Sequence, residues 1–330
     1  MKKHWLGWIV LSLLILLLPV LVLAEGGTCG ENLTWNLNGG VLIISGTGKM
    51  DDYDDKNSLP PWYRKKVTSA VLEEGITDIG DWAFCYCSSL TSIILPEGVT
   101  SIGDDAFYDC TSLTSITLPE GLISIGNSAF YECESLTSII LPEGVTSIGD
   151  DAFYDCTSLT SITLPDSLTS LGDETFYSCE SLTSITLPDS LTSIVDNAFS
   201  SCDSLTSITL PDSLTHIGDD AFSSCDSLTS IILPEGVTCI GDYAFDSCTS
   251  LISITLPDSL THIGDYVFYS CTSLTSITLP DSITEISDTA FRSCPNLILE
   301  VYPDSYAEQY AKEKNLAYFC SESDTSRLVD

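Results

Sequence analysis

The chain of 330 residues carries 47 acidic and only 11 basic side chains, which gives it a formal net charge of −36. Between residues 67 and 291 there is no Lys or Arg. A surface of this charge repels nucleic acids and anionic membranes, so neither is expected as a partner. It attracts basic protein patches and metal cations instead. The plainest interpretation is a solvated acidic surface that keeps the protein soluble outside the cell.

The N-terminus has the pattern of an export signal. Lys2 and Lys3 precede an apolar run over residues 5–23, and Ala24 ends a small-residue cleavage site. We predict a signal peptide over residues 1–24 and a secreted or extracellular cell-surface location. The apolar run is also long enough to remain uncleaved as a membrane anchor. Beyond this signal no membrane contact is expected.

Residues 25–66 form a separate segment before the main body of the chain. Two apolar stretches, 33–37 and 41–45, flank Asn38, Gly39 and Gly40, which is a hairpin signal. Stacked repeats need a cover over their first unit, because that unit would otherwise expose its apolar face. We therefore predict a small β N-terminal cap module.

From residue 67 to about residue 297 the chain repeats with a period of 23 residues. Ten Phe keep this step from Phe84 to Phe291, and ten Cys keep it from Cys87 to Cys294. A fixed period of this length is typical of a solenoid, in which each unit buries its apolar face only against its neighbours. The predicted fold class is a repeat solenoid of ten units.

One unit shows the expected secondary structure. Ile93 and Leu95 alternate with polar or exposed positions, which predicts a short strand that ends at Pro96. Residues 99–102 predict a second short extended piece. Residues 103–107 predict a turn that leads into a single helical turn, with Asp104 as its N-cap. The repeats should therefore consist mainly of short β-strands with turns or single helical turns.

Residues 298–320 have a different pattern and predict a C-terminal cap. Ser305 and Glu308 form a capping box for a helix over about 305–314, with Tyr306, Tyr310 and Ala311 on its inward face. Residues 316–319 predict a last strand. Residues 321–330 are polar and predict a disordered tail.

The repeat unit resembles a known family. Leu90, Ile93, Leu95-Pro96, Ile102-Gly103, Ala106-Phe107 and Cys110 together match the repeat of the BspA-like leucine-rich repeat proteins, of the treponemal class. The resemblance implies a right-handed leucine-rich-repeat horseshoe with a sheet of short strands on its concave side. It also implies adhesion to host matrix proteins, host cells or other microbes. Val195 departs from the pattern, because most units have Gly at that position.

The cysteine column is interpreted as structural. Stacked units place equivalent Cys about 5 Å apart with parallel side chains, a geometry that disfavours disulfides. We expect these thiols to be reduced and buried as small hydrophobes. Cys29 and Cys85 fall outside the column, and a disulfide between them is an alternative for that pair.

Nothing in the chain indicates catalysis. There are three His, and neither a nucleophile with a partnered base nor a phosphate-binding Gly motif is present, so an enzyme is not expected. A binding surface is expected on the concave sheet, where uncharged Ser and Thr columns point outward. The predicted contact residues are Ser115, Thr117, Ser138, Ser161, Thr163, Ser184, Thr186, Ser207, Thr209, Ser253 and Thr255. The alternatives are a merely solvated sheet face, or a Thr array that orders water, as in ice binding.

No cofactor is expected, but two sets of side chains have residue types that bind metal ions. Acidic columns follow each Pro and each repeat Gly, and they suggest weak Ca²⁺ binding, with diffuse screening as the alternative. His216, Cys239 and His262 occupy one column in consecutive units and predict a Zn²⁺ site with water as the fourth ligand. The alternative is neutral drift at a tolerant surface position.

The sequence thus predicts a non-enzymatic leucine-rich repeat protein that binds an extracellular protein or glycoprotein, with a basic ligand as one option. The other class left open is a structural or cation-dependent surface spacer or coat protein without a specific ligand. The sequence leaves the oligomeric state undetermined.

Overall fold

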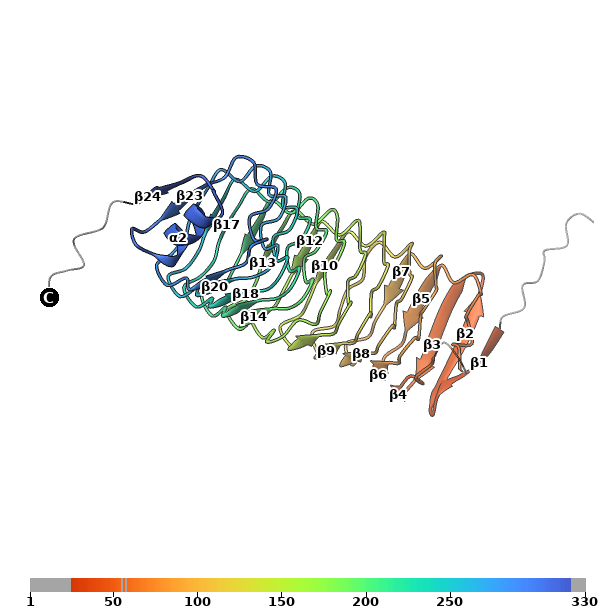
Figure 1. The fold of residues 1–330 in the computed structure, drawn as a ribbon. Coiled ribbons are helices and arrows are strands. Elements are labelled where there is room, and N and C mark those ends of the chain that lie inside the picture. Colours follow the sequence, from red (N-terminus) through yellow and green to blue (C-terminus); the bar gives the residue numbers. More distant parts are fainter. Residues whose placement is uncertain (1–24, 55, 57, 322–330) are drawn as a thin grey trace, which may run out of the picture.

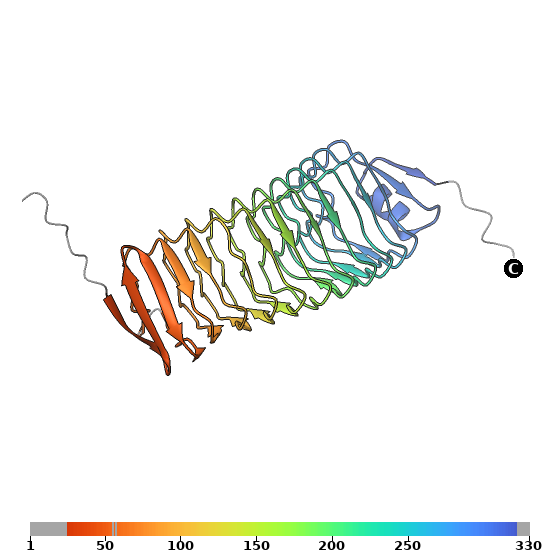
Figure 2. The same cartoon turned by 180° about the vertical axis from the view of Figure 1, so that it is seen from behind.

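The structure, a computed structural model, describes residues 25–54, 56 and 58–321. The predicted signal peptide and residues 322–330 of the predicted tail lie outside the described residues. Figure 1 shows an elongated coil whose successive turns stack side by side, with the N-terminal hairpin at one end and the helix at the other. The view from behind, in Figure 2, shows the same regular stacking on the opposite side.

Most turns of the coil contribute to two columns of short strands, but the turn with residues 115–117 has no strand in the first column, and the turn with Ser170 has only a single bridge in the second. The first column continues the N-terminal strands β1 (Glu25–Gly30), β2 (Leu33–Asn38) and β3 (Val41–Gly46) with β5 (Ser69–Leu72), β7 (Ser92–Ile94), β10 (Ser138–Ile140), β12 (Ser161–Thr163), β13 (Ser184–Thr186), β15 (Ser207–Thr209), β17 (Ser230–Ile232), β19 (Ser253–Thr255), β21 (Ser276–Thr278), β23 (Ile298–Val301) and β24 (Tyr318–Cys320). The second column contains β4 (Gly48–Lys49), β6 (Ile76–Ile79), β8 (Ser101–Ile102), β9 (Ser124–Ile125), β11 (Ser147–Ile148), β14 (Ser193–Ile194), β16 (His216–Ile217), β18 (Cys239–Ile240), β20 (His262–Ile263) and β22 (Glu285–Ile286). Paired strands within the repeats are parallel and in register, so each residue lies beside its equivalent in the next turn.

The N-terminal hairpin is continuous with the solenoid. Strands β2 and β3 pair antiparallel as predicted, and β3 then pairs in parallel with β5, the first repeat strand. Strand β1, which the sequence analysis did not anticipate, adds an outer antiparallel strand to β2. The order β1-β2-β3-β5-β7 makes one sheet from the hairpin and the first two turns.

A third column, here named the turn column, runs along the segments equivalent to residues 104–110. The N–H groups of Asp105, Phe107 and Asp109 each donate to a carbonyl of the next turn at 2.8 Å. The same three bonds recur at every turn from Trp82 to Ser247. Both strand columns, by contrast, are divided into several separate sheets. The turn column is therefore the continuous backbone ladder of the molecule.

The predicted helical turn with an Asp104 N-cap is wrong, and the structure has stacked turns there instead. Asp105 and Asp109 adopt left-handed backbone conformations, with φ of 53° and 55°, which a helix does not contain. Because of these conformations, some backbone N–H groups of the segment donate to carbonyls of their own turn and others donate to carbonyls of the next turn. The Asp104 carboxylate accepts the backbone N–H of Asn127 in the following turn at 2.7 Å, so it links turns rather than capping a helix.

The repeat glycine is required for space rather than for a positive φ. A Cβ at Gly149 would lie 2.5 Å from the backbone N and from Oδ1 of Asn127 in the preceding turn. None of the glycines in this column has a positive φ in the described residues. Val195 takes the position in one turn, and the second strand column is interrupted beside it, between β11 and β14. Strand β14 beside Val195 still pairs in register with β16, and the column is interrupted again between β18 and β20, where the turns keep Gly241 and Gly264.

Ten stacked phenylalanines form the centre of the core. Neighbouring ring centroids along the column from Phe84 to Phe291 are 5.1 to 5.7 Å apart, and the ring planes differ by 2° to 14°. Trp62 extends this stack at the N-terminal end, 5.8 Å from Phe84, and its indole N–H donates to Ala83 O. Tyr310 covers Phe291 at the other end, at 6.3 Å. Aromatic side chains from outside the repeats thus cover both ends of the stack.

The column cysteines are free thiols that link successive turns. The thiol of Cys156 donates to Phe130 O at 3.2 Å, and the equivalent bond is present from Cys110 to Cys294. Burial raises the pKa of these thiols, for Cys87 to about 12. Cys29 and Cys85 are likewise free and buried. Their side chains therefore fill space as small hydrophobes, and the structure has no Cys29–Cys85 bridge.

The C-terminal helix, α2 (Tyr306–Glu313), lies where the capping box placed it. The Glu308 N–H donates to Ser305 Oγ at 3.1 Å, and the Glu308 carboxylate accepts from the Asp304 N–H rather than from that of Ser305. Ala307, Tyr310 and Ala311 are buried. The prediction that Tyr306 faces inward is wrong, since this side chain is 41% exposed. Ser321, assigned to the predicted tail, is bound to β23 through the Val301 carbonyl and the Glu300 carboxylate.

Candidate binding surface

The predicted contact residues all lie on the outward side of the first strand column, and this surface is here named the Ser/Thr face. In each strand the central Ile points into the core, while the residues on either side of it are exposed. Parallel pairing in register aligns Ser138 with Ser161, and Ser184 with Ser207. The structure therefore arranges the predicted residues as two outward columns, in which Ser115 and Thr117 lie in a turn that forms no strand in the first strand column. These residues are Ser115, Thr117, Ser138, Ser161, Thr163, Ser184, Thr186, Ser207, Thr209, Ser253 and Thr255.

The hydroxyl groups of this face differ from others in the protein. Many Ser and Thr hydroxyls donate to a carbonyl of the preceding turn, such as Thr160 to Thr137 O and Ser213 to Leu191 O. In the described chain, no such partner exists for the eleven predicted contact residues, whose hydroxyls face solvent. An exposed hydroxyl without a protein partner can donate to or accept from a ligand. The Ser/Thr face is thus a regular array of unpartnered hydroxyls, although exposed Thr146, Thr192 and Thr238 beside the second strand column also lack a partner for their hydroxyls in the part of the protein that the structure describes.

Exposed isoleucines interrupt the Thr column. Ile94, Ile140 and Ile232 take the position of Thr117 in their turns and are 62%, 71% and 72% exposed. At the N-terminal end, β3 and β5 align Ile43 and Val71 with Ile94, and Ile43 is also exposed. Apolar side chains exposed to this extent mark interaction surfaces when they lie on one face. The predicted contact set omitted them, although the repeat alignment already placed the three isoleucines in the Thr column.

Two open hollows lie on the face. The larger, of about 520 Å³, is lined by Ser161, Thr163, Ser184 and Thr186, with Asp189 at its edge. It coincides with the place where β12 and β13 are not paired in one sheet. The smaller, of about 300 Å³, is lined by residues 115–118 and 138–140, with Glu120 and Pro142 beside them. Both hollows combine hydroxyls with an acidic edge, which suits a ligand with donor groups.

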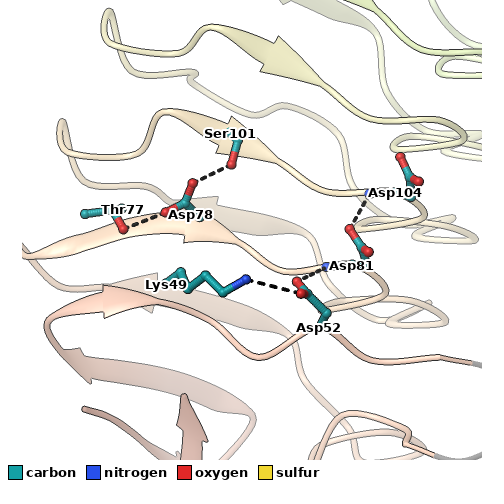
Figure 3. Close-up of polar contacts among 7 residues, drawn as sticks. All are labelled: Lys49, Asp52, Thr77, Asp78, Asp81, Ser101 and Asp104. Carbon is teal, nitrogen blue, oxygen red and sulfur yellow. Dashed lines mark hydrogen bonds and ion pairs between the residues drawn. The ribbon is translucent and has the colours of Figure 1, made fainter. Parts of the chain in front are cut away.

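The two acidic columns have different environments. The carboxylates that follow each Pro are exposed, and Asp258 N donates to Glu235 in one turn. In the column of Asp104, most carboxylates accept the N–H of the equivalent residue in the next turn, whereas Asp265 at the end accepts from the hydroxyls of Ser287 and Thr289. Figure 3 shows the start of this arrangement, where Asp52 accepts from Asp81 N at 3.4 Å and Asp81 accepts from Asp104 N at 2.9 Å. Burial and neighbouring carboxylates raise the pKa of Asp173 in this column.

The predicted zinc ligands are placed on neighbouring turns but are not brought together. His216 pairs in register with Cys239. His262 instead has its imidazole 2.7 Å from the Thr261 hydroxyl and 3.5 Å from the Glu285 carboxylate. Among the residues that the structure describes, no group of three or more His, Cys, Asp or Glu is arranged to hold a metal ion.

The geometry defines the class of protein as a solenoid of 23-residue leucine-rich repeats with a parallel strand column and an aromatic core. The profile of the BspA type leucine-rich repeat region matches residues 61–183 and 169–298 in six copies. The chain therefore belongs to the BspA-type leucine-rich repeat family. No curated protein matches it.

Similar solved structures are bacterial leucine-rich repeat proteins. One from Eubacterium ventriosum is 27% identical with a TM-score of 0.52, and the match covers 83% of this chain and 90% of that one. One from Bacteroides ovatus is 28% identical with a TM-score of 0.47, over 89% and 99% of the two chains. A leucine rich cell surface protein from Faecalibacterium prausnitzii is 26% identical with a TM-score of 0.43, over 88% and 97%. The first of these supports the fold.

Within residues 25–321, apart from the two positions that are not described, no helix has the length and apolar character needed to cross a membrane.

Proposed function

We propose that this chain is an exported, non-enzymatic protein that binds an extracellular protein or glycoprotein through its Ser/Thr face. The observation that carries the proposal is the concentration of unpartnered hydroxyls and exposed isoleucines on that face. Many hydroxyls outside this face, by contrast, link successive turns. Export is supported by the basic and apolar pattern of residues 1–24.

The repetition of the face determines how it binds. Neighbouring turns present nearly the same groups, so a ligand meets a row of weak, equivalent contacts rather than one shaped pocket. Contacts of this kind add by avidity along the surface. The ligand that fits is extended, offers hydrogen-bond donors to the hydroxyls and acidic edges, and places apolar groups against Ile94, Ile140 and Ile232.

The test compares two triple variants with identical chemistry. Thr163→Lys, Thr186→Lys and Thr209→Lys place three long charged side chains on the Ser/Thr face, where all three threonines are exposed. Thr146→Lys, Thr169→Lys and Thr192→Lys place the same charges on the exposed side of the second strand column. Binding of residues 25–330 is measured against purified extracellular matrix proteins, mucins and bacterial cells over a salt series.

Saturable binding that persists at physiological salt, and is lost only in the first variant, is the expected result. Equal loss in both variants would show attraction to net charge alone. Absence of saturable binding to every probe would instead support a structural spacer or coat role without a specific ligand.

A further inference from the structure

A second surface of the solenoid is lined by stacked tyrosines that the repeat analysis did not single out. Tyr108, Tyr131, Tyr154 and Tyr177 occupy one position of the turn column in four successive turns. Their ring centroids are 4.7, 4.5 and 4.6 Å apart, with interplanar angles of 5° to 9°. Each side chain is half-buried, with part of it exposed to solvent. The four rings form a single outward-facing stack.

The stack continues toward the N-terminal cap. Trp82 stacks on Tyr108 with centroids 5.9 Å apart, and Tyr86 packs edge-on against Tyr108 at 5.5 Å. Tyr63 of the cap packs edge-on against Tyr86 at 6.0 Å. This series of seven aromatic side chains, from Tyr63 to Tyr177, is here named the aromatic strip.

Carboxylates accompany the strip. Asp109, Glu132 and Asp155 directly follow the tyrosines in three successive turns and are half-buried. Burial raises the pKa of Asp109 and of Glu132, and for Glu132 the neighbouring acidic groups add to the effect. Among the ion pairs of the described chain, none involves these three carboxylates. The strip therefore holds aligned negative charges that the protein itself does not neutralise.

The strip is confined to part of the solenoid. At the position of Tyr177, the next two turns carry Ser200 and Ser223. At the position of Asp155, the following turns carry Ser178 and Ser201. The buried Phe and Cys columns do not change over the same turns. Tyrosines stack again near the C-terminal end, where Tyr243 and Tyr266 lie 4.8 Å apart, but the position of Asp155 carries Ser247 and Ser270 in those turns. A row of carboxylates beside consecutive stacked rings is therefore particular to the N-terminal half, which indicates a local role.

In the N-terminal cap, basic side chains lie over two aromatic rings, of which Tyr63 belongs to the strip and Trp35 does not. The Arg64 guanidinium lies over the Tyr63 ring, 5.1 Å from its centroid, and Lys65 lies over Trp35 at 5.3 Å. Guanidinium groups bind carboxylates through their fork of donors and also lie flat against aromatic rings. The turns that carry the tyrosines contain no Lys or Arg of their own. The complementary cations must come from another molecule.

We propose that the aromatic strip binds an extended, arginine-rich peptide segment of another protein. Arginine side chains donate to Asp109, Glu132 and Asp155 and pack against the exposed edges and hydroxyls of the tyrosines. Three steps between turns of roughly 4.7 Å span about 14 Å, which matches about four residues of extended chain. This surface is separate from the Ser/Thr face, so the inference goes beyond the function proposed above.

The experiment measures binding of fluorescein-labelled nona-arginine to residues 25–330 by fluorescence anisotropy at about 0.15 M salt. The strip variant combines Asp109→Asn, Glu132→Gln and Asp155→Asn. The matched control combines Glu74→Gln, Glu97→Gln and Glu143→Gln, which remove the same number of charges from the exposed acidic column and line neither hollow of the Ser/Thr face. Nona-lysine serves as the second probe, because lysine has the charge but not the planar fork.

The expected result is saturable binding of nona-arginine that weakens at least about tenfold in the strip variant and less than about threefold in the control. Nona-lysine should bind several-fold more weakly than nona-arginine. Equal weakening in both variants, equal affinity for the two peptides, or no saturation would overturn the proposal. The last measurement is sedimentation of the unliganded chain. A dimer that dissociates only when the strip residues are changed would show that a second copy of this chain occupies the strip, and it would overturn the proposal of an arginine-rich partner. Binding to the Ser/Thr face is tested by other variants, so failure of either proposal leaves the other intact.

Discussion

Gly149→Ala tests whether the repeat glycine is needed for close packing between turns. The added Cβ would lie 2.5 Å from both N and Oδ1 of Asn127 and 2.6 Å from Gly126 C, whereas ordinary contacts of carbon atoms lie near 3.5–4 Å. Relief requires the turns to separate by about 1 Å. That movement breaks the bond from Gly149 N to Ile125 O, now 3.0 Å, and the bond from Asp150 N to Asn127 Oδ1, now 2.9 Å.

The size of the effect follows from those two bonds. Each contributes about 1 kcal/mol, and their unpaired groups add a similar desolvation cost. The alanine also restricts the unfolded chain, which stabilises the folded state by about 0.5 kcal/mol. We expect a net loss of about 2 kcal/mol. Gly121→Ala is the matched control, because its Cβ would meet no heavy atom closer than Glu97 O at 3.3 Å and its φ is not positive.

The assay is urea unfolding followed by far-UV circular dichroism and by tryptophan fluorescence. Gly121→Ala should unfold within about 0.5 kcal/mol of the unmodified chain. Gly149→Ala should unfold at clearly lower urea. If the two variants have the same midpoint, the glycine column is not selected for space and the argument from Cβ contacts fails.

Three further outcomes follow from the core and its titrating groups. Phe153→Ala should destabilise the protein by about 3–5 kcal/mol in urea unfolding, because it opens a cavity in the ring stack, and Phe153→Leu should cost much less. In the native protein 5,5′-dithiobis(2-nitrobenzoate) should modify exposed Cys320 first and half-buried Cys239 next. Apart from half-buried Cys294, column thiols such as Cys156, which burial keeps protonated, should react only after unfolding, and fast modification of these buried thiols would contradict the packing described. Burial raises the carboxyl pKa of residues such as Asp151. The folded state therefore binds protons more tightly than the unfolded one, and this stabilisation is full below about pH 4 and is lost as pH rises through the folded pKa. The melting temperature should accordingly be higher at pH 5 than at pH 7, and a lower value at pH 5 would show that other groups dominate.

The sequence repeat was enough to predict the core residues, but it predicted the surface contacts less well. The period of 23 residues identified the Phe and Cys columns, and Ser305 with Glu308 located helix α2, because both patterns are local. The turn column was missed because its left-handed residues, such as Asp105, are not glycines, so the sequence carries no signal for a positive φ. The pairing of β3 with β5 is a contact between two modules, which no local pattern encodes.

The candidate surfaces show the same division. Alternation within each strand correctly directed Ser161 and Thr163 outward. The same alignment gave no reason to choose between their hydroxyls and those of Thr160, which bonds to Thr137 O in the structure. The tyrosine stack was unexpected because the predicted turn ended at Phe107, and the position of Tyr108 was given no role.

The turn column also determines how the molecule should respond to tension. Its hydrogen bonds run along the coil axis, three at each junction, so a pull on the two ends loads the junctions in series. When one junction opens, the 23 residues of a turn can extend to about 80 Å of chain before the next junction bears the load. The solenoid would then lengthen one turn at a time and remain folded beyond the open junction. Stepwise extension of this kind limits the force that reaches a bound ligand.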